Sequence, residues 1–243
     1  MTTSSLDIMR QLEKSILPLQ GYKTSLQTTK LDLSLGPIDA AFPHQQFPLG
    51  AIHEFIHDHV HDLAASTGFI AGILPALMQQ AGAVIWISTS RLLFPPALTS
   101  FGVKPDQFIF IDLQKEKDIL WVMEEALKCE GLAAVVGELS DLNFTSSRRL
   151  QLAVEQSRVT GFVLRKPMRF ISPTACLSRW KITSLPSQLP GSMPGVGFPR
   201  WNVSLLKIRN GHPGSWPIEF RAGRFYPVSS PASIVLEQRK KTG

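Results

Sequence analysis

The middle of the chain alternates between short apolar runs and longer segments whose apolar residues return every three or four positions. Runs such as AVIWIS at 83–88 are apolar on both faces, which is typical of strands buried inside a parallel sheet. Strands are expected at 51–56, 83–88, 108–113, 132–136 and 160–164. Helices are expected at 68–77, 118–131 and 145–157. This alternation predicts an α/β fold with right-handed βαβ units and a mainly parallel sheet.

The two ends of the chain depart from this alternation. Residues 5–17 have the spacing of an amphipathic helix that Pro18 stops, and 18–46 show no sustained period and are expected to form an extended arm. The helix could dock on a neighbouring protein or pack on the chain's own core. Later strands, which we expect to form an antiparallel edge of the sheet, are predicted at 179–183, 201–208 and 218–220. The predicted organisation is a helix and arm at 1–46, a core at 47–221 and a flexible basic tail at 222–243.

Composition favours a cytoplasmic protein that does not enter a membrane. The chain has 243 residues and 44% hydrophobic content, enough to bury one sizeable core. It has no run of 18 apolar residues, and its N-terminus lacks a basic-then-apolar signal pattern. Two cysteines, Cys129 and Cys176, cannot form a disulfide framework and favour a reducing compartment.

The net charge of +6 is distributed unevenly along the chain. Residues 1–143 carry 9 Lys/Arg and 16 Asp/Glu, whereas residues 144–243 carry 16 Lys/Arg and 3 Asp/Glu. A basic C-terminal half is typical of proteins that bind nucleic acid or an acidic partner protein. The alternative is a basic surface that contacts only solvent.

The segment HEFIH at 53–57 matches the H-E-x-x-H signature of zinc proteases. That chemistry needs a helix, because only there do residues i and i+4 reach one metal ion. On the strand expected here, His53 and His57 would lie about 13 Å apart and could not share an ion. The next residues, which could form either an adventitious metal site or a solvated polar loop, are His57, Asp58, His59, His61 and Asp62. We expect no metal site.

The order strand, polar loop and helix at 51–77 resembles the phosphate-binding part of a P-loop protein. The glycine at Gly68 is present, but Phe69 stands where a Walker A motif has lysine and Ile70 where it has Ser or Thr. The expected loop, 57–67, is also too long for that motif. Without the lysine and the metal-binding hydroxyl, we expect a degenerate P-loop position and no cofactor.

Several motifs in the same order resemble the ImuA family, RecA-like proteins of damage-inducible mutagenesis cassettes. The resemblance covers about residues 47–220. The residues that carry it are FPLGAIHEF at 47–55, VIWIS at 84–88, FGVKPD at 101–106, WVMEEALKC at 121–129, GLAAVVGEL at 131–139, TSSRRLQLA at 145–153 and GHPGSW at 211–216.

The resemblance implies a RecA-like P-loop fold whose Walker motifs are degenerate. Ser90 stands near the position of RecA's catalytic glutamate, Gly137 at that of the Walker B aspartate, and Arg165 near that of the glutamine that senses the γ-phosphate. Four departures, counting the P-loop position, imply that the protein is not an enzyme.

The family also implies a function and partners. The protein is expected to be a non-catalytic accessory factor in SOS-induced, error-prone translesion DNA synthesis. The implied partners are a Y-family polymerase-like protein of the ImuB type, an error-prone DNA polymerase III alpha-type subunit, RecA and DNA. Two alternatives stay open: a weak DNA-dependent ATPase, and an inhibitor of cell division of the SulA type.

Basic residues of the C-terminal half are the candidate contacts with DNA or a partner. Two of them, Lys207 and Arg209, resemble the Lys-Asn-Lys segment with which one RecA subunit reaches its neighbour's nucleotide. This suggests binding at one face of a RecA protomer or at a filament end; the alternative is two exposed basic residues on a strand. The candidates are Arg148, Arg149, Arg165, Lys166, Arg169, Arg179, Lys181, Lys207 and Arg209. Phosphate contact by these residues would make binding strongly dependent on salt.

Overall fold

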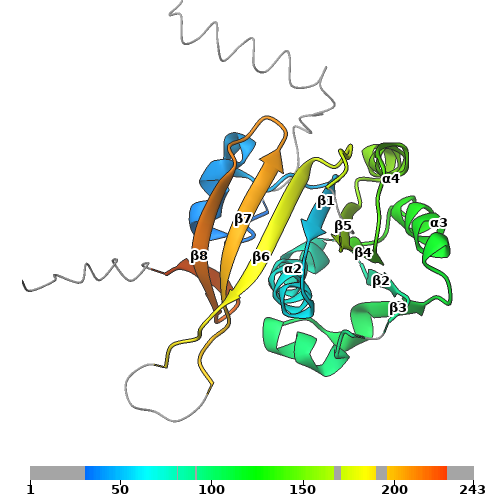
Figure 1. The fold of residues 1–243 in the computed structure, drawn as a ribbon. Helices are drawn as coiled ribbons and strands as arrows, with labels where there is room; N and C mark the ends of the chain where they lie inside the picture. Colours follow the sequence, from blue (N-terminus) through cyan, green and yellow to red (C-terminus); the bar gives the residue numbers. More distant parts are fainter. Residues whose placement is uncertain (1–30, 81, 91, 167–170, 190–195, 229–243) are drawn as a thin grey trace, which may run out of the picture. The chain divides into compact units, whose positions relative to one another are not determined.

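The computed structural model describes residues 31–80, 82–90, 92–166, 171–189 and 196–228 (Figure 1). Its strands are β1 Ile52–Ile56, β2 Val84–Ser88, β3 Phe108–Asp112, β4 Ala134–Leu139, β5 Thr160–Arg165, β6 Ser178–Leu185, β7 Arg200–Ile208, β8 Gly214–Arg221 and β9 Arg224–Pro227. Its α-helices are α2 Val60–Gln80, α3 Glu116–Leu127 and α4 Phe144–Ser157. Short 3-10 helices are η1 Gly36–Ala41, η2 Pro43–Gln45, η3 Pro95–Phe101 and η4 Pro105–Gln107.

All nine strands join one sheet in the order β3-β2-β4-β5-β1-β6-β7-β8-β9. Strands β3 to β6 in that order are parallel, and β7, β8 and β9 continue the sheet as antiparallel neighbours. The prediction of a mainly parallel α/β sheet with an antiparallel C-terminal edge is confirmed. Strand β1 lies near the centre, between β5 and β6, so its residues are enclosed on both edges and both faces.

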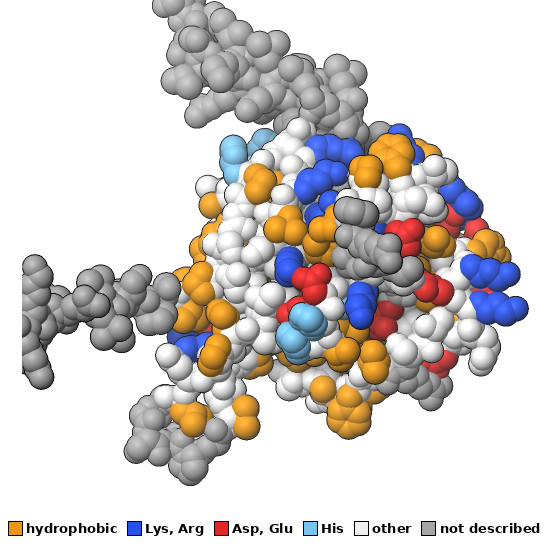
Figure 2. Space-filling model, viewed as in Figure 1, with side chains coloured by type: hydrophobic (Ala, Val, Ile, Leu, Met, Phe, Trp, Pro, Cys, Tyr) orange, Lys and Arg blue, Asp and Glu red, His pale blue; other side chains and the backbone are white. Residues whose placement is uncertain are grey.

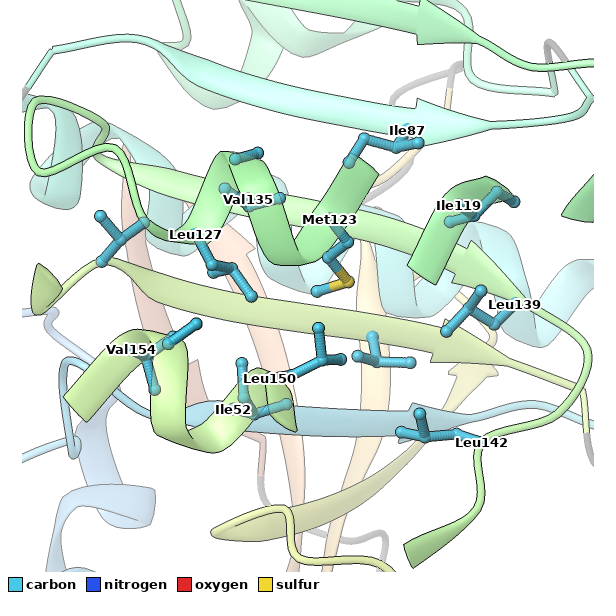
Figure 3. Close-up of a cluster of buried hydrophobic side chains, with 14 of the residues drawn as sticks. Ile52, Ile87, Ile119, Met123, Leu127, Val135, Leu139, Leu142, Leu150 and Val154 are labelled. Carbon is cyan, nitrogen blue, oxygen red and sulfur yellow. The ribbon is translucent and has the colours of Figure 1, made fainter. Parts of the chain in front are cut away.

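Helices cover both faces of the parallel strands. Helix α3 packs on α4 and on β4 and β2, whereas α2 packs on β6 and η3. The crossover from β1 to β2 runs in the opposite direction along the sheet from those of α3 and α4. Right-handed crossovers in opposite directions place their helices on opposite faces. Figure 3 shows the core under α3 and α4, where Met123 and Leu127 meet Ile52, Val135 and Leu150.

An aromatic core fills the other face, between the sheet and α2. The Phe69 ring of α2 lies 5.8 Å from Trp180 of β6, 5.1 Å from Phe225 of β9 and 6.2 Å from Phe55 of β1. Glycine at position 72 lets the helix approach these rings, because a Cβ there would lie 2.6 Å from the Phe225 ring. Aromatic packing of this kind ties the antiparallel strands to the parallel ones.

The prediction of a polar loop at 57–67 is wrong. Helix α2 begins at Val60, so only His57, Asp58 and His59 connect it to β1. Ala64 and Ala65 favour helix, and Asp62 in the first turn is favourable near a helix N-terminus. Gly68, Phe69 and Ile70 therefore lie two turns inside the helix, where Phe69 and Ile70 have no exposed area.

Both flanking segments contribute more structure than the sequence predicts. Within the expected arm, η1 and η2 form, and Leu35, Ile38 and Phe42 are buried in the core. Within the expected tail, β9 pairs with β8. The helix expected at 5–17 and the chain after residue 228 lie outside the described residues.

Helix α2 is long and apolar enough, by length and composition, to cross a membrane. Half of its apolar window is buried inside the protein, and it packs on β6. This is the pattern of a core helix.

We predict that Phe69→Lys, which restores the residue type of a Walker A motif, destroys the fold rather than creating a nucleotide site. An ammonium group at a position with no exposed area has no water or partner, so the loss should exceed about 4 kcal/mol. Phe69→Leu, the control, should cost less than about 2 kcal/mol. Urea unfolding measures both, and equal stabilities would contradict the assignment of Phe69 to the core.

Candidate functional site

The carboxyl ends of β4, β5 and β1 form the part of the sheet where ligands bind in open α/β proteins. After β1 the chain continues to β2, which lies on one side of β1 in the sheet. Strand β6 lies on the other side of β1. Four segments reach this edge of the sheet. They are 57–59 after β1, 140–143 after β4, Lys166 after β5 and the part of the β5–β6 connection at Ser172, which lies beside Arg165 and Leu142.

The connection from β1 to α2 is too short to surround a phosphate group. It has three residues, and the His57 N–H is already bonded to the Arg165 carbonyl, 3.1 Å away. The first turn of α2 carries Asp62, which is 4% exposed and opposes an anion at the helix N-terminus. The connection lacks the backbone cradle of a Walker A site, and Lys181, which reaches it, is paired with Asp58.

A buried ion-pair cluster lies behind this edge, inside the sheet. Glu54, in the middle of β1, contacts the Arg165 Nε through Oε1 and accepts a 2.7 Å hydrogen bond from the Arg179 Nε through Oε2. The Thr174 hydroxyl donates to the same Oε2 over 2.9 Å. Glu54 and Arg165 have no exposed area. We name Glu54, Arg165 and Arg179 the Glu54 cluster.

The Glu54 cluster also holds the connections that border it. Arg165 Nη1 donates to the Leu142 carbonyl over 3.2 Å and reaches Asp141 and the Ser172 hydroxyl. Arg179 Nη2 donates to the Ser172 carbonyl over 2.9 Å. The guanidinium groups thus join β1, β5 and β6 to the segments after β4 and before β6.

The predicted surface role is wrong for Arg165, because its side chain is fully buried against Glu54. Arg179 is 14% exposed and makes the second ion pair to the same carboxylate, so its charge is also used inside the protein. The sequence reasoning missed Glu54 as a charge partner. The available signal was a carboxylate inside an apolar strand, which must be paired when buried.

The remaining candidate cations lie at or near the surface, and most have a partner. Arg149 contacts Glu124 at 2.6 Å, Lys181 contacts Asp58 at 2.5 Å, and Arg148 lies 3.7 Å from Glu155. Lys207 donates to the Thr174 carbonyl over 3.0 Å. Lys166 is exposed, and Arg209 is partly exposed. Arg169 lies outside the described residues. Figure 2 shows basic side chains at several places on the viewed face, many of them beside acidic ones.

The H-E-x-x-H segment lies on a strand, as its sequence context predicts. His53 Nε2–H donates to the Pro48 carbonyl over 2.8 Å, and its Nδ1 accepts from the Ser178 hydroxyl over 2.7 Å. Ser178 in turn accepts from the Trp180 indole. Burial lowers the pKa of His53 to about 4, so the ring is neutral in the folded protein. Within the described residues, no group of three potential metal ligands comes together.

The position that the family resemblance assigns to a Walker B aspartate is closely packed. A Cβ on Gly137 would lie 2.7 Å from Met123 Sδ, so an aspartate would require the Met123 side chain to move. The next residue, Glu138, accepts a 2.8 Å hydrogen bond from the Trp86 indole. Burial raises the pKa of Glu138, while hydrogen bonds from Trp86 and Ser90 oppose that rise.

We predict that Glu54→Gln loses about 3–5 kcal/mol of unfolding free energy, because it leaves two guanidinium groups without their counter-charge. Glu124→Gln, which removes an ion pair at the surface with Arg149, should cost less than about 1 kcal/mol. Urea titrations compare the two. Losses of similar size would contradict the structural role of the Glu54 cluster.

We also predict a pH dependence that originates at His53. The unfolded chain takes up a proton near pH 6.5 and the folded protein only near pH 4, so stability is lost as pH falls through that window. At pH 5 the loss relative to neutral pH should be about 2 kcal/mol. His53→Gln should lack this component when unfolding free energies at pH 7.5 and 5 are compared. An identical pH dependence of stability in the wild type and in His53→Gln would refute the assignment of this effect to His53.

Comparisons with known proteins identify relatives of the chain. No family model matches it. Protein ImuA from Caulobacter vibrioides, in strains NA1000 / CB15N and ATCC 19089 / CIP 103742 / CB 15, is 35% identical over 208 residues, covering 81% of this chain and 85% of the relative. SulA from Pseudomonas aeruginosa is 19% identical with a TM-score of 0.42 and covers 49% of this chain and 100% of SulA, a likeness too low to identify a shared fold. The resemblance predicted from the sequence motifs is confirmed by the curated relatives, and this chain belongs to the ImuA family.

Proposed function

We propose that this chain is an accessory protein in SOS-induced, error-prone translesion DNA synthesis. It has a RecA-like core, and it acts by binding partners rather than by hydrolysing a nucleotide. Membership of the ImuA family supports the role in mutagenesis. The mainly parallel sheet with helices on both faces is compatible with a RecA-like core.

The three-residue connection between β1 and α2 carries the proposal of a non-catalytic protein. A nucleotide triphosphate needs several free backbone N–H groups and a cation at this place. The chain provides a short turn, an occupied His57 N–H and a buried Asp62 instead. The crowded Gly137 and the Trp86-bound Glu138 add to this argument, because Gly137 has no carboxylate and the Glu138 carboxyl group is already hydrogen-bonded to the Trp86 indole.

In this proposal the partners are a Y-family polymerase-like protein of the ImuB type, an error-prone DNA polymerase III alpha-type subunit, RecA and DNA. Lys207 and Arg209 lie at the end of β7, where the Lys207 ammonium group is held by the Thr174 carbonyl next to the Glu54 cluster. A positioned cation at the surface suits contact with an anionic group on a RecA subunit or on DNA. Arg148, Arg149, Lys166 and Lys181 are further contacts in the proposal.

The test is damage-induced mutation frequency in a strain whose own copy is replaced by variants. Glu138→Gln should retain mutagenesis, because a neutral side chain keeps the acceptor for Trp86 and no catalysis depends on it. Lys207→Ala/Arg209→Ala should lower the induced frequency about tenfold or more, whereas Lys117→Ala/Lys128→Ala, an equal loss of charge on α3 and at its C-cap, should not. Loss of function in Glu138→Gln, with purified protein hydrolysing ATP, would favour an enzyme. Full activity of Lys207→Ala/Arg209→Ala would exclude that surface.

A further inference from the structure

Strands β6 to β9 present one face to the aromatic core and the opposite face to solvent. Trp180, Trp201 and Phe220 belong to the aromatic core, on which α2 and η1 pack. Because successive side chains of a strand alternate between faces, their neighbours point the other way. Figure 1 shows β7 and β8 in front of η1, and Figure 2, in the same view, shows a largely uncharged polar surface over β7. We name this solvent-facing side the polar face, after Lys181, Asn202, Ser204, Ser215, Arg221 and Arg224.

Uncharged hydrogen-bonding groups form the centre of the polar face. Ser204 of β7 lies between Lys181 of β6 and Ser215 of β8 in the strand register. The Ser204 and Ser215 hydroxyl oxygens are 2.9 Å apart, and the Ser215 hydroxyl donates to the Asn202 Oδ1 over 3.0 Å. A hydroxyl has one donor and two acceptor sites, so these contacts leave capacity for an incoming polar group.

Cations lie at both ends of this centre. Lys181 is at one end, in the same row as Ser215, and Arg221 and Arg224 oppose each other at the other end. Arg221 also lies 4.4 Å from the centre of the Tyr226 ring. Ser215 and Arg221 are six residues apart on β8, so about 20 Å separates the two ends. A single phosphate or carboxylate would reach only one end, whereas a polymer with repeated negative charges would contact both.

The polar face carries a net positive charge. Among its described strand residues, Glu219 is the acidic one; it is 8% exposed and contacts Arg200 at 2.6 Å and Arg221 at 3.8 Å. Beside the strands, Asp58 pairs with Lys181. That pair is partly exposed, so another anion can replace the carboxylate at small cost. The strand cations outnumber these two carboxylates, which complements a polyanion.

The chain after the described residues adds positive charge near the same face. Val228 donates its N–H to the Pro217 carbonyl of β8 over 2.9 Å, so residues 229–243 begin beside the polar face. They contain three basic residues, at 239–241, and one acidic residue, Glu237. Like charges disfavour this segment as the occupant of the polar face, whereas one polyanion can bind both.

We propose that the polar face binds single-stranded DNA. The cations at its two ends contact phosphates, and the Asn202, Ser204 and Ser215 side chains contact sugars or base edges. A single strand can lay its base edges on an open sheet, whereas a duplex presents them only within its grooves. A polar centre also favours nucleic acid over a protein partner, because the centre of a protein interface is apolar. The choice of DNA rests on the proposed function, whereas the location rests on the geometry of β6 to β9.

Binding is measured by fluorescence anisotropy with a labelled dT oligonucleotide of about 15 nucleotides. Ser204→Glu places a carboxylate in the centre of the polar face and should weaken binding by the full chain about tenfold. Gln114→Glu adds the same charge at an exposed position after β3, at the opposite end of the sheet, and should leave binding unchanged. Equal affinities of wild type and Ser204→Glu would overturn the proposal.

A loss of cations tests the other end of the polar face. Arg221→Ala/Arg224→Ala removes two phosphate contacts, so the slope of log affinity against log salt should become shallower by about 1.4. Lys117→Ala/Lys128→Ala, the matched control at α3, should keep the wild-type slope. An unchanged slope in Arg221→Ala/Arg224→Ala contradicts the assigned surface.

Two competitors identify the occupant. A duplex of the same length, or poly-glutamate, that displaces the oligonucleotide as well as unlabelled dT does would overturn the assignment to single-stranded DNA. Wild-type protein that binds no oligonucleotide would overturn this inference alone. The accessory role is tested separately by the mutation frequency of Lys207→Ala/Arg209→Ala, so the two failures are distinguishable.

Discussion

Glu54 is a charge in the centre of the sheet, and much of the surrounding structure satisfies it. Strand β1 is enclosed by β5 and β6, so the carboxylate cannot reach water. Arg165 from β5 and Arg179 from β6 supply the compensating charges from both neighbours. Any strand order or register that separated Glu54 from Arg165 and Arg179 would be destabilised, because an unpaired buried charge costs several kcal/mol. The contacts of Arg165 and Arg179 with Leu142 and Ser172 extend this constraint to the nearby connections.

The opposite face of β1 depends on apolar packing and one neutral histidine. His53 and Phe55 point to the same face of β1, and the His53 ring lies 4.3 Å from the Phe47 ring, tilted by 32°. Because both ring nitrogens are hydrogen-bonded, the side chain can be buried among aromatic rings without a charge. Glu54 thus belongs to the charged cluster, while its neighbour His53 belongs to the neutral core on the other face of β1. This explains why a segment that matches a zinc motif has no metal-binding geometry.

Sequence reasoning recovers the elements whose apolar period is clear. Strands such as β2 and β4 and the helix α4 lie close to their predicted positions, because continuous apolar runs and a helical apolar period are local signals. The start of α2 was missed, since the polar side chains of His61, Asp62 and Ser66 obscure its helical period. The Glu54 cluster was missed for a different reason. Pairing of residues more than 100 positions apart follows from strand order, which periodicity alone does not specify.

The difference between buried and surface ion pairs determines which cations can serve a partner. Releasing Arg165 would remove one of the two counter-charges of the buried Glu54 carboxylate, so recruitment of Arg165 by a phosphate or an acidic side chain would cost several kcal/mol. Surface pairs such as Lys181 with Asp58 contribute about 1 kcal/mol or less, and an incoming anion can replace the carboxylate. The same basic half of the sequence therefore contains two populations: arginines that hold the sheet together, and exposed cations that remain available for binding. Charge in the sequence alone cannot separate them, because the distinction depends on which residues face β1.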